Sequence, residues 1–309
     1  PNSTQFNSIQ FLMSPKYALF TGASSGIGYN LAIELSKKGY KVIGCSPQLV
    51  LFGQKPLEQE YGVISLPLDV TDIDNIKTVL KKVEEITGGR LDVLYNNAGI
   101  SISGPAIEID ETQLNKVFQV NVIGQINMTK YFAPLIINAK GTILFTSSVA
   151  ARVPLSWVSA YNATKAAIDA YALTLHGEMA PFGVRVHSVI TGGVDTAICD
   201  GNIKTSLGDS FYDVDGVYES IRSSAMMSRD LNISPEQYAK EVVRDIVSWR
   251  DPGFNLYHGA RSYFLHWVSR FLPLWLVEFG VQIHFKQRRV LQTIAKLIKV
   301  KKSQEKKYV

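Results

Sequence analysis

Short apolar runs alternate with longer amphipathic segments over the first 260 residues of the chain. The runs have the length of strands, and the segments between them repeat apolar positions with a helical period. Strands are expected at 17–20, 40–45, 63–68, 91–95, 142–146, 184–190 and 255–258. Helices are expected from 28 to 38 and over 72–87, 111–139 and 234–249. This alternation predicts a three-layer α/β domain around a doubly wound parallel sheet.

A glycine-rich turn links the first predicted strand to the first helix. It reads Thr21-Gly22-Ala23-Ser24-Ser25-Gly26-Ile27-Gly28. Glycines let the backbone approach a pyrophosphate closely, and the free amides and the positive dipole end of the helix attract it. The turn therefore predicts a dinucleotide site in a Rossmann-type fold. The expected contacts are Gly22, Ser24, Ser25, Gly26, Ile27 and Gly28.

The same turn also fits G-x-S-x-G, the nucleophile elbow of hydrolases, with Ser24 as the nucleophile. A hydrolase would need a downstream acid and a histidine as well. The five histidines, at 176, 187, 258, 266 and 284, form no such pattern. A lipid-surface ester hydrolase that uses Ser24 is nevertheless kept as the alternative function from another class of enzyme.

Polar residues at the carboxyl ends of later strands extend the expected crevice, because open α/β sheets bind ligands there. Ser46 stands where an acid would bind the ribose of NAD and repel the extra phosphate of NADP. Its neutral hydroxyl favours NADPH, with the phosphate expected to meet Ser24, Ser46 and nearby amides. Asp69 and Val70 follow the third strand. Asp69 either contacts the adenine or caps a turn.

Tyr161 and Lys165 lie four residues apart on a predicted helix, so both project from one face. An ammonium group beside a phenol favours the ionised phenol, which can then exchange a proton with a substrate oxygen near neutral pH. Such pairs also arise by chance on exposed helices. Ser148 ends the fifth strand thirteen residues before Tyr161 and could hold a carbonyl oxygen within reach of the phenol.

Together these motifs resemble the short-chain dehydrogenase/reductase family over about residues 16–196. The glycine turn resembles the cofactor turn of the family, and Asn97-Ala98-Gly99 resembles its sheet-stabilising motif. The resemblance implies hydride transfer between a nicotinamide cofactor and a carbonyl or alcohol. It also implies a catalytic tetrad of Asn121, Ser148, Tyr161 and Lys165.

The resemblance assigns each of these residues a role. Tyr161 would donate the proton, and Ser148 would polarise the carbonyl. Lys165 would lower the pKa of Tyr161 and hold the nicotinamide ribose. Asn121 would support a water relay, and no metal is expected. Val194 and Thr196 follow the sixth strand, where the family contacts the nicotinamide. One departure precedes them, because Thr191-Gly192-Gly193 replaces the usual proline-glycine.

A narrower resemblance covers nearly the whole chain. The segments 94–99, 125–128, 190–194 and 273–278 are similar to those of the fungal NADPH-dependent 1-acyldihydroxyacetone-phosphate reductases. This branch implies reduction of the ketone to 1-acylglycerol 3-phosphate in phosphatidic acid synthesis. It also implies a place on the endoplasmic reticulum membrane and lipid droplets, with the catalytic domain facing the cytosol. The chain departs at Ser46-Pro47-Gln48, where those relatives carry basic residues. A steroid or retinoid is the alternative substrate within the family.

The last segment of the chain is apolar and then basic. Residues 263–283 are rich in aromatic and aliphatic side chains but include Arg270, Pro273 and Glu278, which oppose a single membrane span. A helix pair lying in the membrane interface is expected, drawn to anionic lipid by the basic tail. The same side chains could instead cover the substrate pocket or form a dimer contact.

Composition adds limits to this interpretation. The 309 residues carry a formal net charge of +5, concentrated after Lys286, and no nucleic-acid-binding motif accompanies it. Two cysteines indicate neither a disulfide framework nor a zinc site, and they fit a reducing compartment. The start shows no secretory signal. We expect a flexible segment at 1–15, the catalytic domain at 16–260 and a membrane-associating extension at 261–309. A homo-oligomer is compatible with this plan.

Overall fold

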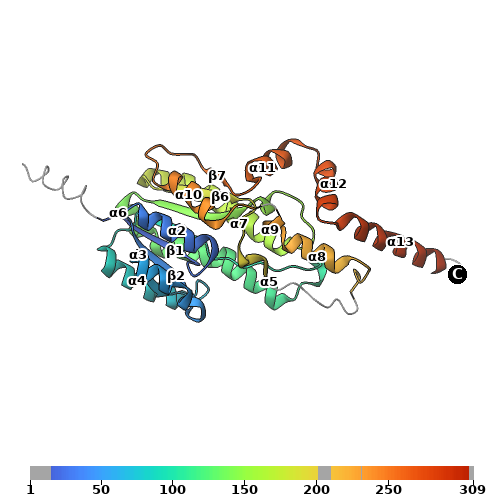
Figure 1. Cartoon of the computed structure of the whole chain (residues 1–309), viewed down its shortest axis with the longest axis horizontal. Helices are drawn as coiled ribbons and strands as arrows, with labels where there is room; N and C mark the ends of the chain where they lie inside the picture. Colours follow the sequence, from blue (N-terminus) through green and yellow to red (C-terminus); the bar gives the residue numbers. More distant parts are fainter. Residues whose placement is uncertain (1–14, 201–209, 231, 306–309) are drawn as a thin grey trace, which may run out of the picture.

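The computed structural model describes residues 15–200, 210–230 and 232–305, so nearly all of the predicted N-terminal segment lies outside the described residues. Seven parallel strands form one sheet in the order β3-β2-β1-β4-β5-β6-β7 (Figure 1). The strands are β1 (Tyr17–Thr21), β2 (Lys41–Ser46), β3 (Ile64–Pro67), β4 (Val93–Asn96), β5 (Thr142–Ser148), β6 (Arg185–Thr191) and β7 (Asn255–His258). The order reverses between β1 and β4, and a crevice at the carboxyl ends of the strands is expected there. The predicted doubly wound sheet is confirmed.

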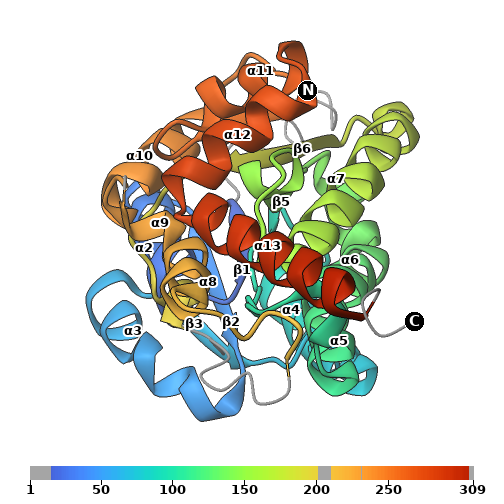
Figure 2. The ribbon, with the colours of Figure 1, turned by 90° about the vertical axis from the view of Figure 1, so that its right-hand side faces the viewer.

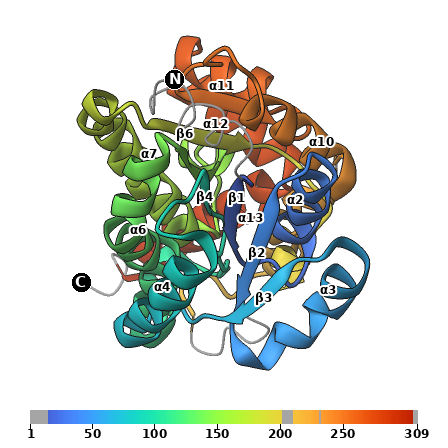
Figure 3. The same cartoon turned by 90° about the vertical axis from the view of Figure 1, so that its left-hand side faces the viewer.

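Helices cover both faces of this sheet, as the end-on views show (Figures 2 and 3). One face carries α2 (Gly26–Lys37), α3 (Lys55–Tyr61) and α10 (Pro235–Ile246), and the other carries α4 (Ile73–Thr87), α6 (Gln125–Ala139) and α7 (Ser159–Met179). The strands are apolar at successive positions because both faces are buried. Leu19 belongs to the core beneath α4, α6 and α7, whereas its neighbour Phe20 belongs to the core beneath α2 and α10.

The helix predicted over 111–139 is interrupted. The structure has α5 (Glu111–Phe118), a π-helical turn η3 (Gln119–Gly124) and then α6. Gly124 lies against the third strand's exit, where a Cβ would be 2.9 Å from the carbonyl oxygen of Val70. The wider turn therefore accommodates a close approach of two backbones and carries Asn121 inward. Periodicity alone does not distinguish such a turn from a continuous helix.

Other helical elements were not expected from the sequence. The connection from β2 to β3 contains η1 (Gln48–Gln54) ahead of α3, and the segment after β6 contains α8 (Val217–Ala225) and α9 (Met227–Asp230). Short 3-10 turns complete the description: η2 (Ala106–Glu108), η4 (Val149–Ala151), η5 (Ala180–Phe182) and η6 (Ala197–Asp200).

Three helices follow the last strand and lie across the carboxyl end of the sheet (Figure 2). They are α11 (Ser262–Phe271), α12 (Leu274–His284) and α13 (Gln287–Glu305), and we call the first two the cover helices. Pro273 at the cap of α12 separates them, because proline ends the preceding helix and suits the start of the next. Helix α13 extends away from the body (Figure 1). Within the described ranges, no helix has both the length and the apolar character to cross a bilayer.

Backbone hydrogen bonds connect the end of β7 and the segment before α11 to the residues that follow β6. The amide of Gly192 donates to His258 O at 2.8 Å, and Gly193 exchanges bonds with Ala260 at 3.1 and 2.9 Å. A Cβ at position 192 would lie only 2.1 Å from Ala260 O. Glycine at this position therefore lets the two backbones meet, in the stretch where the sequence departs from the family pattern.

Candidate active site

The glycine turn has the close backbone geometry that a pyrophosphate needs. Gly22 has φ +68°, and a Cβ on Gly28 would lie 2.3 Å from Gly22 O. Helix α2 begins at Gly26, and the side chain of its cap residue Ser25 makes no capping bond. The amides of the first turn thus face the cavity without a side-chain cap, and this cradle fits a dinucleotide phosphate.

Asn97 ties the turn to two other strands. Its side-chain amide donates to Thr21 O at 3.0 Å and to Gly22 O at 3.3 Å, while its Oδ1 accepts from Thr146 Oγ1 at 3.2 Å. The amides of Asn97 and Ala98 both donate to Thr21 Oγ1. The sheet-stabilising role expected for this motif is visible in these bonds between β1, the end of β4, and β5.

Ser46 has a different position from the one predicted. It is buried, and its hydroxyl donates to Cys45 O while accepting from the Ser24 amide at 3.0 Å and from Gln54 Nε2 at 2.9 Å. The hydroxyl is used within the protein and does not line the cavity. Ser46 therefore holds the glycine turn in place, and the predicted contact with the cofactor phosphate is wrong for its side chain. Sequence reasoning missed Gln54, which only the fold brings next to Ser46.

Asp69 and Val70 lie at the cavity rim beside the glycine turn. The carboxylate of Asp69 accepts from the amide and the hydroxyl of Thr71, at 2.9 and 2.7 Å. The turn-capping reading of Asp69 is therefore seen in the structure, and its exposed position leaves an adenine contact open as a prediction. Asp72, three residues on, caps α4, because its side chain accepts from the amides of Asp74 and Asn75.

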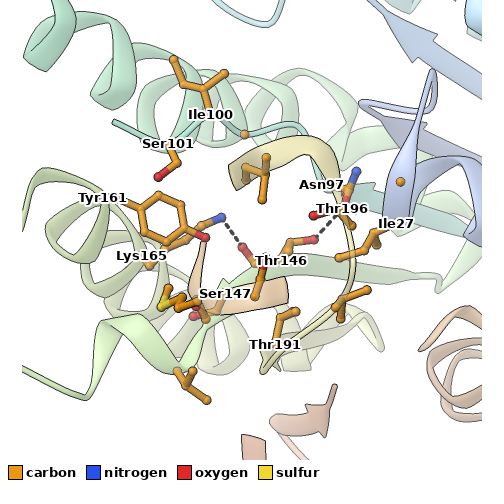
Figure 4. Close-up of a pocket in the computed structure, with 18 of the residues that line it drawn as sticks. Ile27, Asn97, Ile100, Ser101, Thr146, Ser147, Tyr161, Lys165, Thr191 and Thr196 are labelled. Carbon is orange, nitrogen blue, oxygen red and sulfur yellow. Dashed lines mark hydrogen bonds between the residues drawn. The ribbon is translucent and has the colours of Figure 1, made fainter. Parts of the chain in front are cut away.

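Tyr161 and Lys165 project together into the cavity from α7 (Figure 4). Lys165 is fully buried, its Nζ donates to Thr146 O at 2.7 Å, and it lies 5.6 Å from the centre of the Tyr161 ring. Burial lowers the pKa of Lys165, and the charge of Asp169 offsets part of this effect, so that the resulting pKa is about 8. A main-chain oxygen thus holds the ammonium group beside the phenol, which is the arrangement that proton transfer requires.

Ser148 and Asn121 complete the expected tetrad from two other elements. Ser148 ends β5, lines the cavity with Tyr161, and accepts the amide of Ala150 at 3.1 Å. Asn121 is buried in the π-helical turn, where it exchanges two bonds of 2.9 Å with the backbone of Ile100 and donates to Thr164 Oγ1. These bonds fix Asn121 next to the tyrosine helix. Its part in a water relay stays a prediction.

An ionic network behind Lys165 was missed by sequence reasoning. Asp169 lies one helical turn beyond Lys165 and accepts from Arg152 at 2.8 Å and from Ser188. Arg152 also contacts His266 Nδ1 on α11. Burial and the nearby Arg152 lower the pKa of His266. The network therefore connects the catalytic helix to a cover helix. The spacing of Asp169 from Lys165 was the one signal in the sequence that could have indicated it.

A cavity of about 1460 Å³ runs from the glycine turn to the cover helices. Tyr161, Lys165 and Ser148 are among its polar lining residues. The cover helices supply an apolar wall made of Phe264, Leu265, Val268, Leu272, Leu276, Val277, Gly280 and Val281. Val281 and Phe285 pack against the cluster that contains Tyr161. The arrangement can hold a long apolar group next to a proton donor.

The segment after β6 closes the cofactor side of the cavity. Gly192, Gly193, Val194 and Thr196 all line it. Thr196 lies against the glycine turn, since a Cβ on Gly26 would be 3.2 Å from Thr196 Cγ2. Thr191, in place of the family's proline, binds the Tyr238 hydroxyl at 2.8 Å. Although threonine replaces the proline of the family at position 191, Val194 and Thr196 still line the cavity where the cofactor contact was predicted.

The described residues give no hydrolytic triad around Ser24. His176 and His187 bind main-chain oxygens of Val186 and Gly253, and His258 binds Asp245. His266 is engaged with Arg152. His284 lines the cavity beside Phe285 at the cover helices. Within the part of the chain that the structure describes, no cluster of His, Cys, Asp or Glu suits a metal ion either.

Comparison with known proteins agrees with this geometry. A family model described as short chain dehydrogenase matches residues 16–206. The chain is 40% identical over 281 residues to the NADPH-dependent 1-acyldihydroxyacetone phosphate reductase of Saccharomyces cerevisiae, covering 89% of this chain and 93% of that protein. The protein of the same name from Schizosaccharomyces pombe is 43% identical over 184 residues, covering 59% of this chain and 61% of its own.

A solved structure gives the same architecture. The crystal structure of a short-chain dehydrogenase from Streptomyces avermitilis aligns with a TM-score of 0.71 and 27% identity, covering 89% of this chain and 98% of that one. Similarity in both sequence and fold therefore extends past the catalytic core into the region of the cover helices.

Proposed function

Because the chain belongs to the short-chain dehydrogenase/reductase family, we propose that it reduces the ketone of 1-acyldihydroxyacetone phosphate to 1-acylglycerol 3-phosphate with NADPH. The observation that carries the proposal is the single cavity that joins the Tyr161–Lys165 pair to an apolar wall from the cover helices. The relative from Saccharomyces cerevisiae, which is named for this activity, covers both parts.

The residues of the chain divide the task of catalysis. NADPH supplies the hydride when it is bound, and the glycine turn, Asn97 and Thr196 would hold it. Ser148 would hold the carbonyl oxygen, and Tyr161 would give that oxygen its proton. Lys165 keeps a positive charge beside the phenol because Thr146 O holds the ammonium group in place. The apolar wall excludes water and strengthens these electrostatic effects.

The proposed preference for NADPH rests on the absence of an acidic side chain in the segment that follows β2. Residues 46–54 contain no acidic side chain that would repel the extra phosphate of NADPH. They contain no basic side chain either, so the phosphate would rely on Ser24, Ser25 and the amides of the glycine turn. Steady-state comparison of NADPH with NADH tests this point, and a preference for NADH would overturn it.

We propose that the cover helices and α13 also place the enzyme on the endoplasmic reticulum membrane and on lipid droplets, with the core facing the cytosol. Tyr263, Phe271, Leu274 and Trp275 are all more than half exposed on the outside of the cover helices. Arg288, Arg289, Lys296 and Lys299 are exposed on α13. Apolar and basic surfaces side by side suit an anionic lipid interface, at roughly 1 kcal/mol per basic residue near it.

Kinetics with two substrates test the activity. We expect the wild type to reduce 1-acyldihydroxyacetone phosphate faster than a steroid ketone. In Tyr161→Phe the rate of this reduction should fall by a factor of about 10²–10⁴, while the variant still binds NADPH. A faster reduction of the steroid would favour the other substrate class. Ester hydrolysis that survives in Tyr161→Phe would point to Ser24 and to a hydrolase.

Sedimentation with membranes tests the location. Deletion of residues 263–309 should move the protein from the membrane fraction to the supernatant. A milder variant keeps the cavity wall and replaces four basic residues by glutamine, namely Arg288, Arg289, Lys296 and Lys299. Its binding to anionic vesicles should weaken, while its binding to neutral vesicles should not change. Unchanged pelleting of both variants would refute the membrane proposal and leave the catalytic one standing.

A further inference from the structure

One helical face of α12 lines the cavity. Its lining residues include Val277, Gly280, Val281 and His284, which follow the spacing of a single face. Trp275 and Ile283 lie outside this face and are mostly exposed. The inner face therefore consists of small and medium side chains, with one position that has no side chain at all.

Gly280 combines three features: it lies inside a helix, it has open space around it, and it lines the cavity. It lies inside α12, where glycine is unfavourable because its backbone loses more freedom than that of other residues. A Cβ built on it would meet no atom within 4 Å. Neither a positive φ nor a close backbone approach accounts for this glycine, unlike Gly22 or Gly192. Gly280 is exposed and lines the cavity, so its missing side chain leaves open space on that side of α12.

The cavity that Gly280 lines is also lined by Tyr161 and Lys165. Val281, the next residue, packs with Phe285 against the cluster that contains Tyr161. Phe264 and Val268 of α11 line the same cavity. A chain that leaves the reacting carbonyl through the apolar part of the cavity thus meets the wall to which Gly280 belongs.

We propose that Gly280 sets the length of the acyl chain that the enzyme accepts, an inference that rests on the proposed reduction of 1-acyldihydroxyacetone phosphate. A larger residue at 280 fills the channel and excludes the distal part of a long chain. A short chain ends before this point and is bound as before. Gly280 is in this sense a specificity-determining residue, and the chemistry at Tyr161 does not depend on it.

The test is a comparison of acyl-chain lengths. We would measure kcat/KM for the acetyl, octanoyl and palmitoyl forms of dihydroxyacetone phosphate with the wild type, Gly280→Ala and Gly280→Leu. Each methylene kept from an apolar site costs about fourfold in binding. Exclusion of about three methylenes by the leucine should lower kcat/KM for the palmitoyl form by roughly 60-fold. The acetyl form should stay within about twofold of the wild type, and the alanine variant should lie between.

Gly177→Leu is the matched control. Gly177 also lies inside a helix, α7, and a Cβ there meets no atom within 4 Å, but it does not line the cavity. We expect no change in its chain-length profile. An equal loss for all three substrates in Gly280→Leu, or no loss for the palmitoyl form, would overturn the inference while leaving the proposed function intact. A wild type that reduces none of the three forms would overturn the proposed function, and the inference with it.

Discussion

Replacement of Gly28 by alanine should weaken NADPH binding through one steric contact. The new Cβ would lie 2.3 Å from Gly22 O and 2.7 Å from Asn97 Nδ2. Ordinary contacts between such atoms are about 3.5 Å, so the glycine turn and α2 would have to separate by roughly 1 Å. The separation would strain the bond from Asn97 Nδ2 to Gly22 O, which holds the turn against the sheet.

The expected magnitude follows from this displacement. Overpacking of a close-packed site costs about 1–3 kcal/mol, and each 1.4 kcal/mol is a factor of about ten in affinity. If the whole cost falls on cofactor binding, the Kd for NADPH, measured by titration of its fluorescence, should rise by about 5- to 150-fold. Thermal unfolding of the same variant reports how much of the cost falls on stability in the absence of cofactor.

Gly177→Ala is the control for a change from glycine to alanine inside a helix. Its Cβ has free space, so this variant should gain about 0.5–1 kcal/mol of stability and bind NADPH as the wild type does. A Gly28→Ala protein that unfolds cooperatively and binds NADPH within about twofold of the wild type would refute the argument that this glycine is needed for close backbone approach.

Three further predictions concern titratable groups. Since burial lowers the pKa of Lys165 to about 8, the ammonium group is lost as the pH rises through 8, and kcat/KM for ketone reduction should fall there. His266 has a lowered pKa, so the folded state favours its neutral form; below its ordinary value of 6.5 the contact with Arg152 should weaken, and proteolysis of the cover helices should accelerate. His266→Gln should abolish that acceleration. Burial raises the pKa of Cys45 to about 12, so mass spectrometry should find it unalkylated until the protein is denatured.

The cover helices connect the catalytic and membrane proposals. Their inner face lines the cavity, whereas their outer face exposes Phe271 and Trp275. A helix that is apolar on both sides is uncommon on the surface of a water-soluble protein, because contact of aromatic side chains with water is energetically unfavourable. An apolar environment on the outside would remove this cost and would deliver an acyl chain directly to the cavity wall.

The order of strands and helices, the glycine turn and the Tyr161–Lys165 pair could all be predicted from the sequence. Strand and helix order follow from local periodicity, and the glycine turn follows from residues that only close backbone contacts require. Tyr161 and Lys165 follow from the geometry of one helical turn. These features are local, so a pattern over a few residues is enough to predict them.

Contacts between segments far apart in the chain could not be predicted from local patterns and are visible only in the folded structure. It buried Ser46 beneath Gln54, and it placed Asp169 in a network that reaches His266. It also turned the inner face of the C-terminal helices toward the cavity, where Gly280 leaves space. The apolar pattern of residues 263–283 favours a membrane interface but is also compatible with a pocket cover or a dimer contact. Hydrophobic burial has no direction of its own, and the packing of the whole chain decides which surface each side chain meets.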